Sequence, residues 1–445
     1  MRKGKSGIVA LSVILILCLI VSACGNNNEK QTTTSALEKP SNNAPEKEGP
    51  AAAGDPVEIE MWTHESNEAE DKYKRERVEA FNAAHDGKIK VKLTGIPRGQ
   101  SSNGYEERMN VAIAANELPD IVDVDGPNAA AYVQSGILAP MDEYLTDEDL
   151  KDFVGSVIEQ GTYEGKLYLL APTESGVVLF YNKKALADAG IKPATSIEDA
   201  WTWEEFYQNA KKLKKGENFP VTFFDNYGVG EWQTYMATPF VWSNGSNIIS
   251  EDGSTTDGYL NSPETIEVLE NIAKFYTEKL STTSPGETDW QDQKSPLAIG
   301  GVWVAAETKF EYGMMPLPYY KTPKSPSGGW SYGVTQQSEN MKEATEVIKW
   351  MTNTDTVKGH AEAITMPPSR TSVFAQMDKF NSEPFKIVAD QLKQSAQARP
   401  RTPVYPVLSK AFAEAYSAAA FGKDVKTVLD DAVKKVDQQI AYLKK

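Results

Sequence analysis

The chain has 445 residues, which is enough for two domains of ordinary size and too many for one simple core. Hydrophobic residues make up 40% and charged residues 24%, a composition typical of globular proteins. The formal charge is −16, and it becomes −19 once Arg2, Lys3 and Lys5 are removed with an N-terminal signal. So acidic a chain is a poor candidate for binding nucleic acid or an anionic membrane surface, and we expect no nucleic-acid partner.

The first 24 residues predict a secretory signal peptide. A positive segment is followed by an apolar segment at residues 8–21, which is short for a membrane span. The signal ends in Ser22-Ala23-Cys24-Gly25, which resembles the lipobox of bacterial lipoproteins. The resemblance implies that Cys24 is acylated and anchors the protein to the outer face of the bacterial cell membrane. An ordinary cleavage site that precedes a cysteine by chance is the alternative.

Residues 25–55 differ in composition from the rest of the chain. They contain runs of Asn and Thr, several prolines and almost no large apolar residue. Because such a segment cannot bury a core, we expect a disordered tether that holds the folded part away from the membrane. Cys18 lies within the predicted signal, so the mature protein would have no free thiol and no disulfide.

The first part of the folded chain alternates between strands and helices. Strands are predicted at 57–62 and 89–96 and from 118 onward, with helices at 73–84 and 105–116. Strands separated by helices favour parallel βαβ units and therefore an α/β fold. Ligands bind beyond the carboxyl ends of such strands. Those ends are the loops at 62–65, 95–98 and 123–128.

The stretch 171–182 is rich in β-branched and aromatic residues, which predicts a strand through the middle of a sheet. Glu174 lies inside this stretch. Burying an unpaired carboxylate costs several kcal/mol or more, so a charge here needs a partner or water. We therefore expect the segment to pass from one domain to another, with Glu174 facing the gap between them.

The rest of the chain mixes both element types. The pair Thr202 and Glu205 predicts a capping box for a helix at 203–213, and Ser262-Pro263 predicts the start of another helix. The stripe of that second helix is expected to be Ile266, Leu269, Ala273, Tyr276 and Leu280. Residues 225–247 mix aromatic residues with glycines and suggest a Gly-rich loop around Trp232. Further elements are a helix at 183–189, strands at 297–303, 312–317 and 330–334, a helix at 344–351, and two helices separated by Gly422 after Pro406.

Several segments carry a family resemblance in this order: 116–123 with 132–140, 165–172 with 180–183, 201–206, 252–253 with 261–264, and 298–303. Together they resemble the extracellular solute-binding proteins of ABC importers, the group that includes maltose- and oligosaccharide-binding lipoproteins. The resemblance covers residues 56–445 and implies a two-lobe, type II periplasmic-binding-protein-like α/β fold. Two parallel-sheet lobes would be joined by three crossings, near 171–176, 328–334 and 367–373. Lobe I would be 56–173 plus 330–368, and lobe II 174–329 plus 369–445.

The resemblance also implies a function. A monomer without cofactor or catalytic residues would close on a carbohydrate, an oligosaccharide, between the lobes and deliver it to the ABC transporter permease. A sugar offers apolar faces and a belt of hydroxyl groups, so its site needs aromatic rings and paired polar groups. The candidate ligand-binding residues are Trp62, His64, Glu65, Asp123, Asp125, Asn128, Glu174, Glu231, Trp232, Trp303, Trp330 and Arg370.

Each candidate also has a structural alternative. Trp303, after Gly300-Gly301, is favoured as a ring that stacks on the sugar, whereas Trp330 could equally pack at a hinge. The polar residues of the first-lobe loops could simply be exposed, and Arg370 could pair with an acid. Tyr405 and Phe412 resemble late second-lobe positions that reach the ligand.

Two other functions remain open from the sequence. A surface glycosidase could use paired carboxylates such as Glu174 and Asp123, although no motif fixes a nucleophile. The same fold could instead present its ligand to a sensor kinase. Three histidines do not lie at metal-ligand spacing, and Asp123-Val124-Asp125-Gly126 lacks the closing Glu of a calcium loop, so no metal is predicted.

Overall fold

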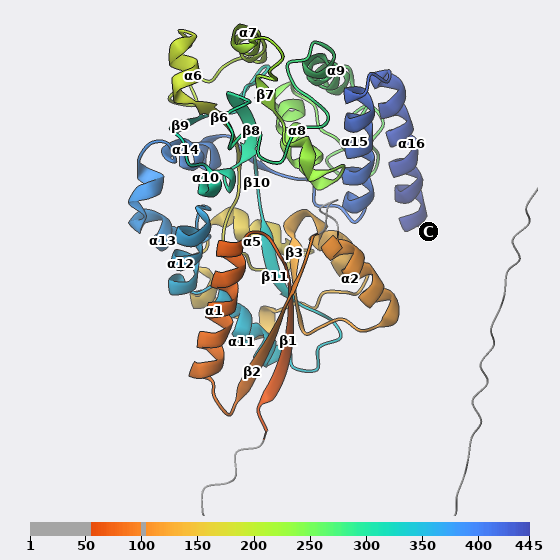
Figure 1. The fold of residues 1–445 in the computed structure, drawn as a ribbon. Helices are drawn as coiled ribbons and strands as arrows, with labels where there is room; N and C mark the ends of the chain where they lie inside the picture. The colour runs from red at the N-terminus through yellow and green to blue at the C-terminus, as the bar shows by residue number, and fades with distance from the viewer. Residues whose placement is uncertain (1–54, 99–103) are drawn as a thin grey trace, which may run out of the picture. The chain divides into compact units, whose positions relative to one another are not determined.

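A computed structural model describes residues 55–98 and 104–445 (Figure 1). The predicted signal peptide, Cys24 and residues 25–54 of the predicted tether lie outside the described residues. In the part of the chain that is described, none of the helices combines the length and the apolar character needed to cross a membrane.

The first sheet has the strand order β11-β3-β1-β2. Strand β1 (Val57–His64) pairs in parallel with β2 (Ile89–Ile96) and β3 (Ile121–Asp125), whereas β11 (Trp330–Val334) joins β3 in antiparallel fashion. Helix α1 (Glu68–Ala84) connects β1 to β2, and α2 (Gly104–Ala115) precedes β3 (Figure 1). The predicted parallel βαβ units are confirmed. The carboxyl ends of β1 and β3 therefore meet the start of β11 at one edge of the sheet.

The second sheet has the order β7-β8-β6-β9 and is mixed rather than parallel. Strand β6 (Val177–Asn182) pairs antiparallel with β8 (Leu297–Gly301) and β9 (Tyr312–Met315), and only β7 (Val221–Thr222) is parallel to β8. The family resemblance implied a parallel sheet here, and that expectation was wrong, because the central strand β6 runs antiparallel to both of its neighbours. Residues 177–180 are fully buried, which agrees with the predicted central strand.

Three sequence expectations for this part of the chain need correction. Strand β6 begins at Val177, so Glu174 precedes the strand. Residues around Trp232 form helix α8 (Glu231–Ser243) instead of a loop, and this helix is buried from Trp232 onward although it contains Pro239. Helix α9 (Pro263–Thr277) buries a broader face than the predicted stripe, including Val268, Ile272 and Phe275, because α8 and two C-terminal helices pack against it.

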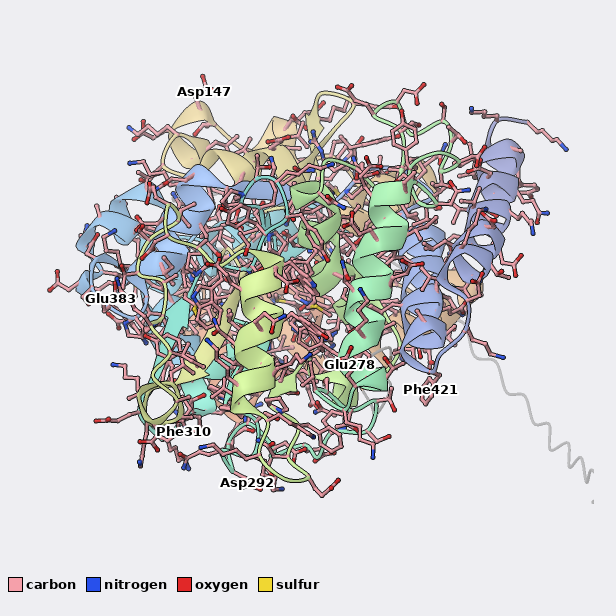
Figure 2. The ribbon with its side chains drawn as sticks, turned by 90° about the horizontal axis from the view of Figure 1, so that it is seen from above. Asp147, Glu278, Asp292, Phe310, Glu383 and Phe421 are labelled. Carbon is pink, nitrogen blue, oxygen red and sulfur yellow. The ribbon has the colours of Figure 1, made fainter. Side chains whose placement is uncertain are left out.

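The C-terminal helices are α15 (Tyr405–Ala420) and α16 (Val425–Leu443). They pack on each other and on α9, and the positive φ of Gly422 (82°) allows the tight turn between them. Figure 2 labels Phe421, which is 69% exposed at this turn. The capping box of Thr202 and Glu205 is confirmed at the start of α7 (Trp203–Leu213).

The three segments predicted as crossings lie side by side. Leu170 bridges to Tyr332, and Thr173 bridges to Pro368. The backbone N–H of Glu174 donates to the carbonyl of Pro367 at 2.8 Å. The lobe boundaries drawn from the sequence stay a prediction.

The remaining elements are η1 (Gly126–Asn128), α3 (Ala129–Gln134), η2 (Asp142–Tyr144), α4 (Asp147–Leu150), α5 (Gly155–Gly161), β4 (Thr162–Tyr163), β5 (Lys166–Leu167), α6 (Lys183–Asp188), η3 (Asp225–Tyr227), α10 (Val304–Glu307), β10 (Ser325–Ser327), α11 (Met341–Met351), α12 (Thr354–Ile364), α13 (Thr371–Gln376), η4 (Asp378–Asn381), α14 (Lys386–Gln394) and β12 (Ala396–Ala398).

Candidate ligand-binding site

Three predicted site residues meet at the edge of the first sheet. His64 ends β1, Asp123 lies in β3, and Trp330 begins β11. The ring of His64 stacks on Trp330, with 3.9 Å between centroids and 29° between planes. Its Nδ1 lies 2.6 Å from Oδ2 of Asp123, and its backbone N–H donates to the same carboxylate. The adjacency of β1, β3 and β11 therefore explains why these side chains touch.

A buried ion pair between Lys74 and Glu70 lies next to the backbone of His64. Nζ of Lys74 lies 2.9 Å from Oε1 of Glu70 and donates to the carbonyl of His64 at 3.3 Å. Burial lowers the pKa of His64 and the nearby charge of Lys74 lowers it further, while Asp123 opposes the shift without reversing it. We therefore assign a neutral imidazole at pH 7, whose Nδ1–H donates to Asp123 and holds the ring against Trp330.

A second group of residues, the Arg399 network, joins distant parts of the chain. The guanidinium of Arg399 donates to both carboxylate oxygens of Asp125, at 2.9 and 2.8 Å. It also donates to Glu231 at 2.6 Å. Asp125 ends β3, Glu231 begins α8, and Arg399 follows β12. Arg399 is only 5% exposed, so this is a buried ion pair. Its net contribution to stability depends on whether its hydrogen-bond geometry offsets the cost of removing the charges from water.

Glu231 is held by more than the arginine. The hydroxyl of Tyr405 donates to Oε1 at 2.6 Å, and the hydroxyl of Ser409 donates to Oε2. Burial raises the pKa of Glu231, and Arg399 opposes that shift. The carboxylate is thus fixed in position by three donors.

A group of aromatic residues lies next to this network. Trp303 is partly exposed, and its ring contacts Trp232 (5.8 Å between centroids, 73°) and lies nearly parallel to Tyr235 (6.5 Å, 16°). Trp232 is buried and anchored, because its indole N–H donates to the carbonyl of Phe223 at 2.6 Å. A Cβ at Gly301 would come within 2.1 Å of the Trp303 ring, so the glycine makes room for that ring. Trp303 is therefore the better candidate for stacking on a ligand.

Tyr235 connects the aromatic group to the Arg399 network. The guanidinium carbon of Arg399 lies 4.4 Å from the centre of its ring, at cation–π distance. Its hydroxyl is 2.6 Å from Ser175 Oγ, and that hydroxyl donates to the carbonyl of Gly328 at the second crossing. The structure thus brings seven of the twelve candidate residues into one contiguous set, since Trp330 pairs with Asp125 across the sheet: His64, Asp123, Asp125, Glu231, Trp232, Trp303 and Trp330. Tyr405, which the family resemblance also pointed to, joins this set through Glu231.

Glu174 is buried, with 2% exposure, and its oxygens have protein partners. The backbone N–H of Gly328 donates at 2.9 Å, that of Ser175 at 3.3 Å, and the hydroxyl of Ser156 at 2.5 Å. Burial raises the pKa of Glu174, and these donors oppose that shift. In this structure Glu174 ties the first and second crossings together, and its role as a ligand contact stays a prediction.

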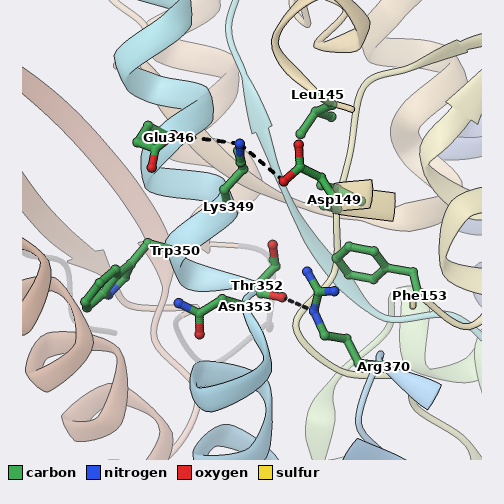
Figure 3. Close-up of a pocket in the computed structure, with 10 residues that line it drawn as sticks. Leu145, Asp149, Phe153, Glu346, Lys349, Trp350, Thr352, Asn353 and Arg370 are labelled. Carbon is green, nitrogen blue, oxygen red and sulfur yellow. Dashed lines mark hydrogen bonds and ion pairs between the residues drawn. The ribbon is translucent and has the colours of Figure 1, made fainter. Parts of the chain in front are cut away.

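Among the described residues, the side chains of the remaining candidates form no hydrogen bond or ion pair with the polar groups of this set, although Trp62 belongs to the same hydrophobic cluster as Tyr105, against which Trp330 packs. Trp62 is buried beneath the guanidinium of Arg108, Glu65 is exposed, and Asn128 is partly exposed. Arg370 lines a pocket of about 240 Å³ that contains none of the other candidate residues, shown in Figure 3. There its Nε donates to the carbonyl of Thr352 at 2.6 Å, and its guanidinium lies 4.1 Å from the ring centre of Phe153.

Comparison with known proteins places the chain in a family. Residues 65–358, more than half of the chain, match the profile described as bacterial extracellular solute-binding protein. The chain belongs to this family. The members of the family are solute-binding proteins, so the set around Arg399 in this solute-binding protein is a candidate site for binding a solute.

Individual relatives of this solute-binding protein are distant in sequence. A putative binding protein of Brucella abortus is 25% identical over 417 residues, covering 89% of this chain and 95% of the relative. The maltotriose-binding protein of Pyrococcus abyssi is 25% identical, covering 67% of this chain and 65% of the relative. An ABC substrate-binding protein of Listeria monocytogenes, solved in complex with cycloalternan, has the same fold with a TM-score of 0.75 and 19% identity. That alignment covers 87% of this chain and 100% of the Listeria chain.

The sequence reasoning missed Arg399 and Tyr235, which hold the set together. Arg399 is 274 residues from Asp125 and 168 from Glu231 along the chain, so no local pattern connects them. Pro400 beside it marks the end of a strand, which was the only available signal. In the described ranges, no group of three or more His, Cys, Asp or Glu side chains has the geometry to hold a metal ion.

Proposed function

We propose that this solute-binding protein captures an oligosaccharide and delivers it to the permease of an ABC transporter. The observation that carries the proposal is the pairing of a partly exposed aromatic ring, Trp303, with the buried polar network of Arg399, Asp125 and Glu231. An aromatic ring suits the apolar face of a sugar, and fixed carboxylates suit its hydroxyl groups. The maltotriose-binding relative supports the same class of ligand.

The proposal includes a lipid anchor at Cys24 and a tether of residues 25–55, which together would keep a monomer near its permease. The lobes would comprise 56–173 plus 330–368 and 174–329 plus 369–445. The mechanism would be closure of the two lobes, with the ligand stabilising the closed state by its higher affinity for it. No covalent step is involved.

A glycosidase with paired carboxylates is the enzymatic alternative. Such an enzyme needs one carboxyl group free to donate a proton and another free to attack or to activate water. The pair named from the sequence is already bonded, because Glu174 accepts from Ser156 and Gly328 and Asp123 accepts from His64. Asp125 and Glu231 both accept hydrogen bonds from Arg399, and Glu231 has two further donors. These bonds favour a fixed binding network over proton transfer, and we therefore propose that the protein is not an enzyme.

The test uses the chain without residues 1–24, titrated in a calorimeter with neutral oligosaccharides of different linkage. We expect saturable binding of at least one sugar and recovery of that sugar intact by chromatography after prolonged incubation. Binding also stabilises the folded state by RT ln(1 + [L]/Kd), so the melting temperature rises with the logarithm of ligand concentration at high saturation, which gives a rapid screen. Cleaved sugar would favour the enzyme, and a folded protein that binds none of the sugars would refute the proposal.

A further inference from the structure

Two charged side chains beside the candidate site carry polar atoms without partners. Arg98 follows β2, and its guanidinium carbon lies 5.5 Å from the ring centre of Trp330. Glu106 lies in the first turn of α2. Nε of Arg98 and Oε2 of Glu106 are buried and have no hydrogen-bond partner among the described residues. Buried polar atoms are nearly always paired, so each exception calls for an explanation.

The neighbours of these two side chains belong to the candidate site. Tyr105, adjacent to Glu106, makes an edge contact with Trp330 at 5.6 Å, and its hydroxyl donates to the carbonyl of Asp123 at 2.8 Å. Burial raises the pKa of Glu106, a hydrogen bond from its own backbone N–H and the charge of Arg98 oppose that shift, and the charges of Asp125 and Asp123 add to it. Arg98, Tyr105 and Asp123 are therefore linked through the ring of Trp330 and the Tyr105 hydroxyl at the edge where β1 and β3 end, and Glu106 is the next residue after Tyr105 on α2.

The charges of the surrounding side chains restrict which ligand groups could bind the unpaired atoms of Arg98 and Glu106. Four carboxylates are found here, those of Asp123, Asp125, Glu231 and Glu106, against the guanidinium groups of Arg98, Arg399 and Arg108, the last of which lies over Trp62; the nearby Lys74 is paired with Glu70. A ligand carboxylate would add another negative charge to this excess and would be disfavoured. A hydroxyl group both donates and accepts, so neighbouring hydroxyls of an uncharged sugar could serve Glu106 and Arg98 together.

We propose that Arg98 and Glu106 are specificity-determining ligand contacts, which bind neighbouring hydroxyl groups of a sugar and select uncharged over acidic oligosaccharides. This inference rests on the proposed function. It also gives Trp330 a second role. The ring of Trp330 stacks on His64, and the guanidinium of Arg98 lies over it. Trp330 therefore positions that guanidinium and is not only a surface for the sugar.

The experiment is a calorimetric titration of the chain without residues 1–24, using the neutral trisaccharides maltotriose, arabinotriose and raffinose and the acidic trisaccharide trigalacturonate. We expect a neutral sugar to bind and trigalacturonate to bind at least a hundredfold more weakly. Glu106→Gln and Arg98→Gln should each weaken the neutral sugar at least tenfold. The matched controls are Glu107→Gln, the exposed neighbour on the same helix, and Arg75→Gln, an exposed arginine on α1; both should stay within twofold of the unmodified chain.

Melting temperatures without ligand show whether each variant is folded. Neutral binding within twofold of the unmodified chain in both Glu106→Gln and Arg98→Gln would overturn this inference while leaving the proposed function intact. Equal or tighter binding of trigalacturonate by the unmodified chain would overturn it without relying on any variant. A folded chain that binds none of the four sugars would overturn the proposed function and this inference with it.

Discussion

Removal of Arg399 is the perturbation whose outcome the structure defines most sharply. In Arg399→Gln, Asp125 loses a two-bond ion pair while remaining 8% exposed, and Glu231 keeps its bonds from Tyr405 and Ser409. Leaving a buried charge without its partner costs about 3–5 kcal/mol. Most of that loss should arise at Asp125, because Glu231 retains two donors. We therefore expect the free energy of unfolding to fall by about 3 kcal/mol or more.

The assay is urea unfolding followed by circular dichroism, with Arg401→Gln as the matched control. Arg401 lies two residues away and pairs with Glu159, but both side chains are substantially exposed, at 37% and 62%. Exposed pairs contribute at most about 1 kcal/mol, so the control should lose little stability. The double variant Asp125→Asn/Arg399→Gln should lose less than the sum of the single variants, because position 125 then carries no charge to be left unpaired, and Glu231 keeps its two hydroxyl donors. Equal, small losses in Arg399→Gln and Arg401→Gln would refute the reasoning.

The remaining predictions concern the site, pH and the anchor. Trp303→Ala should weaken sugar binding at least tenfold by calorimetry and reduce the change in tryptophan fluorescence on binding; unchanged affinity would exclude stacking on this ring. Burial raises the pKa of Asp225 from 3.8 to about 6. Its folded state then binds a proton more readily than the unfolded state, so stability falls as pH rises from about 4 to 6, by at most about 3 kcal/mol. Asp225→Asn should remove that part of the pH dependence in melting curves, and identical curves for both proteins would contradict it. Cys24→Ser in the full chain should move the protein from the membrane fraction to the soluble fraction; retention in the membrane fraction would argue against acylation at this residue.

Local patterns in the sequence predicted local structure well. The capping box of Thr202 and Glu205 gave the start of α7 correctly, since its hydrogen bonds span only three residues. The alternation of apolar and polar residues in β1 and β2, with a helix between the two strands, correctly predicted their parallel pairing in the first sheet. Helix α8 was missed because it is buried on every side and contains Pro239, so it shows neither the periodicity nor the composition expected of a surface helix.

The site was predictable only in part, for a related reason. Strand ends in a parallel sheet share an edge, which is why His64 and Asp123 could be placed together from the sequence. The partners of Arg399 come from β3 and α8, and nothing near position 399 indicates either of them. For Glu174, the sequence predicted correctly that a buried carboxylate needs partners. It could not predict which residues those partners are, because Gly328 and Ser156 are brought to Glu174 only by tertiary packing.

The central claim is that this solute-binding protein binds an oligosaccharide without altering it. Its most direct test is calorimetric titration of the chain lacking residues 1–24 with neutral oligosaccharides, followed by chromatography of the recovered sugar. The account predicts saturable binding with one sugar per chain and a sugar that is recovered intact. A folded chain that binds none of these sugars, or a sugar recovered in fragments, would contradict it.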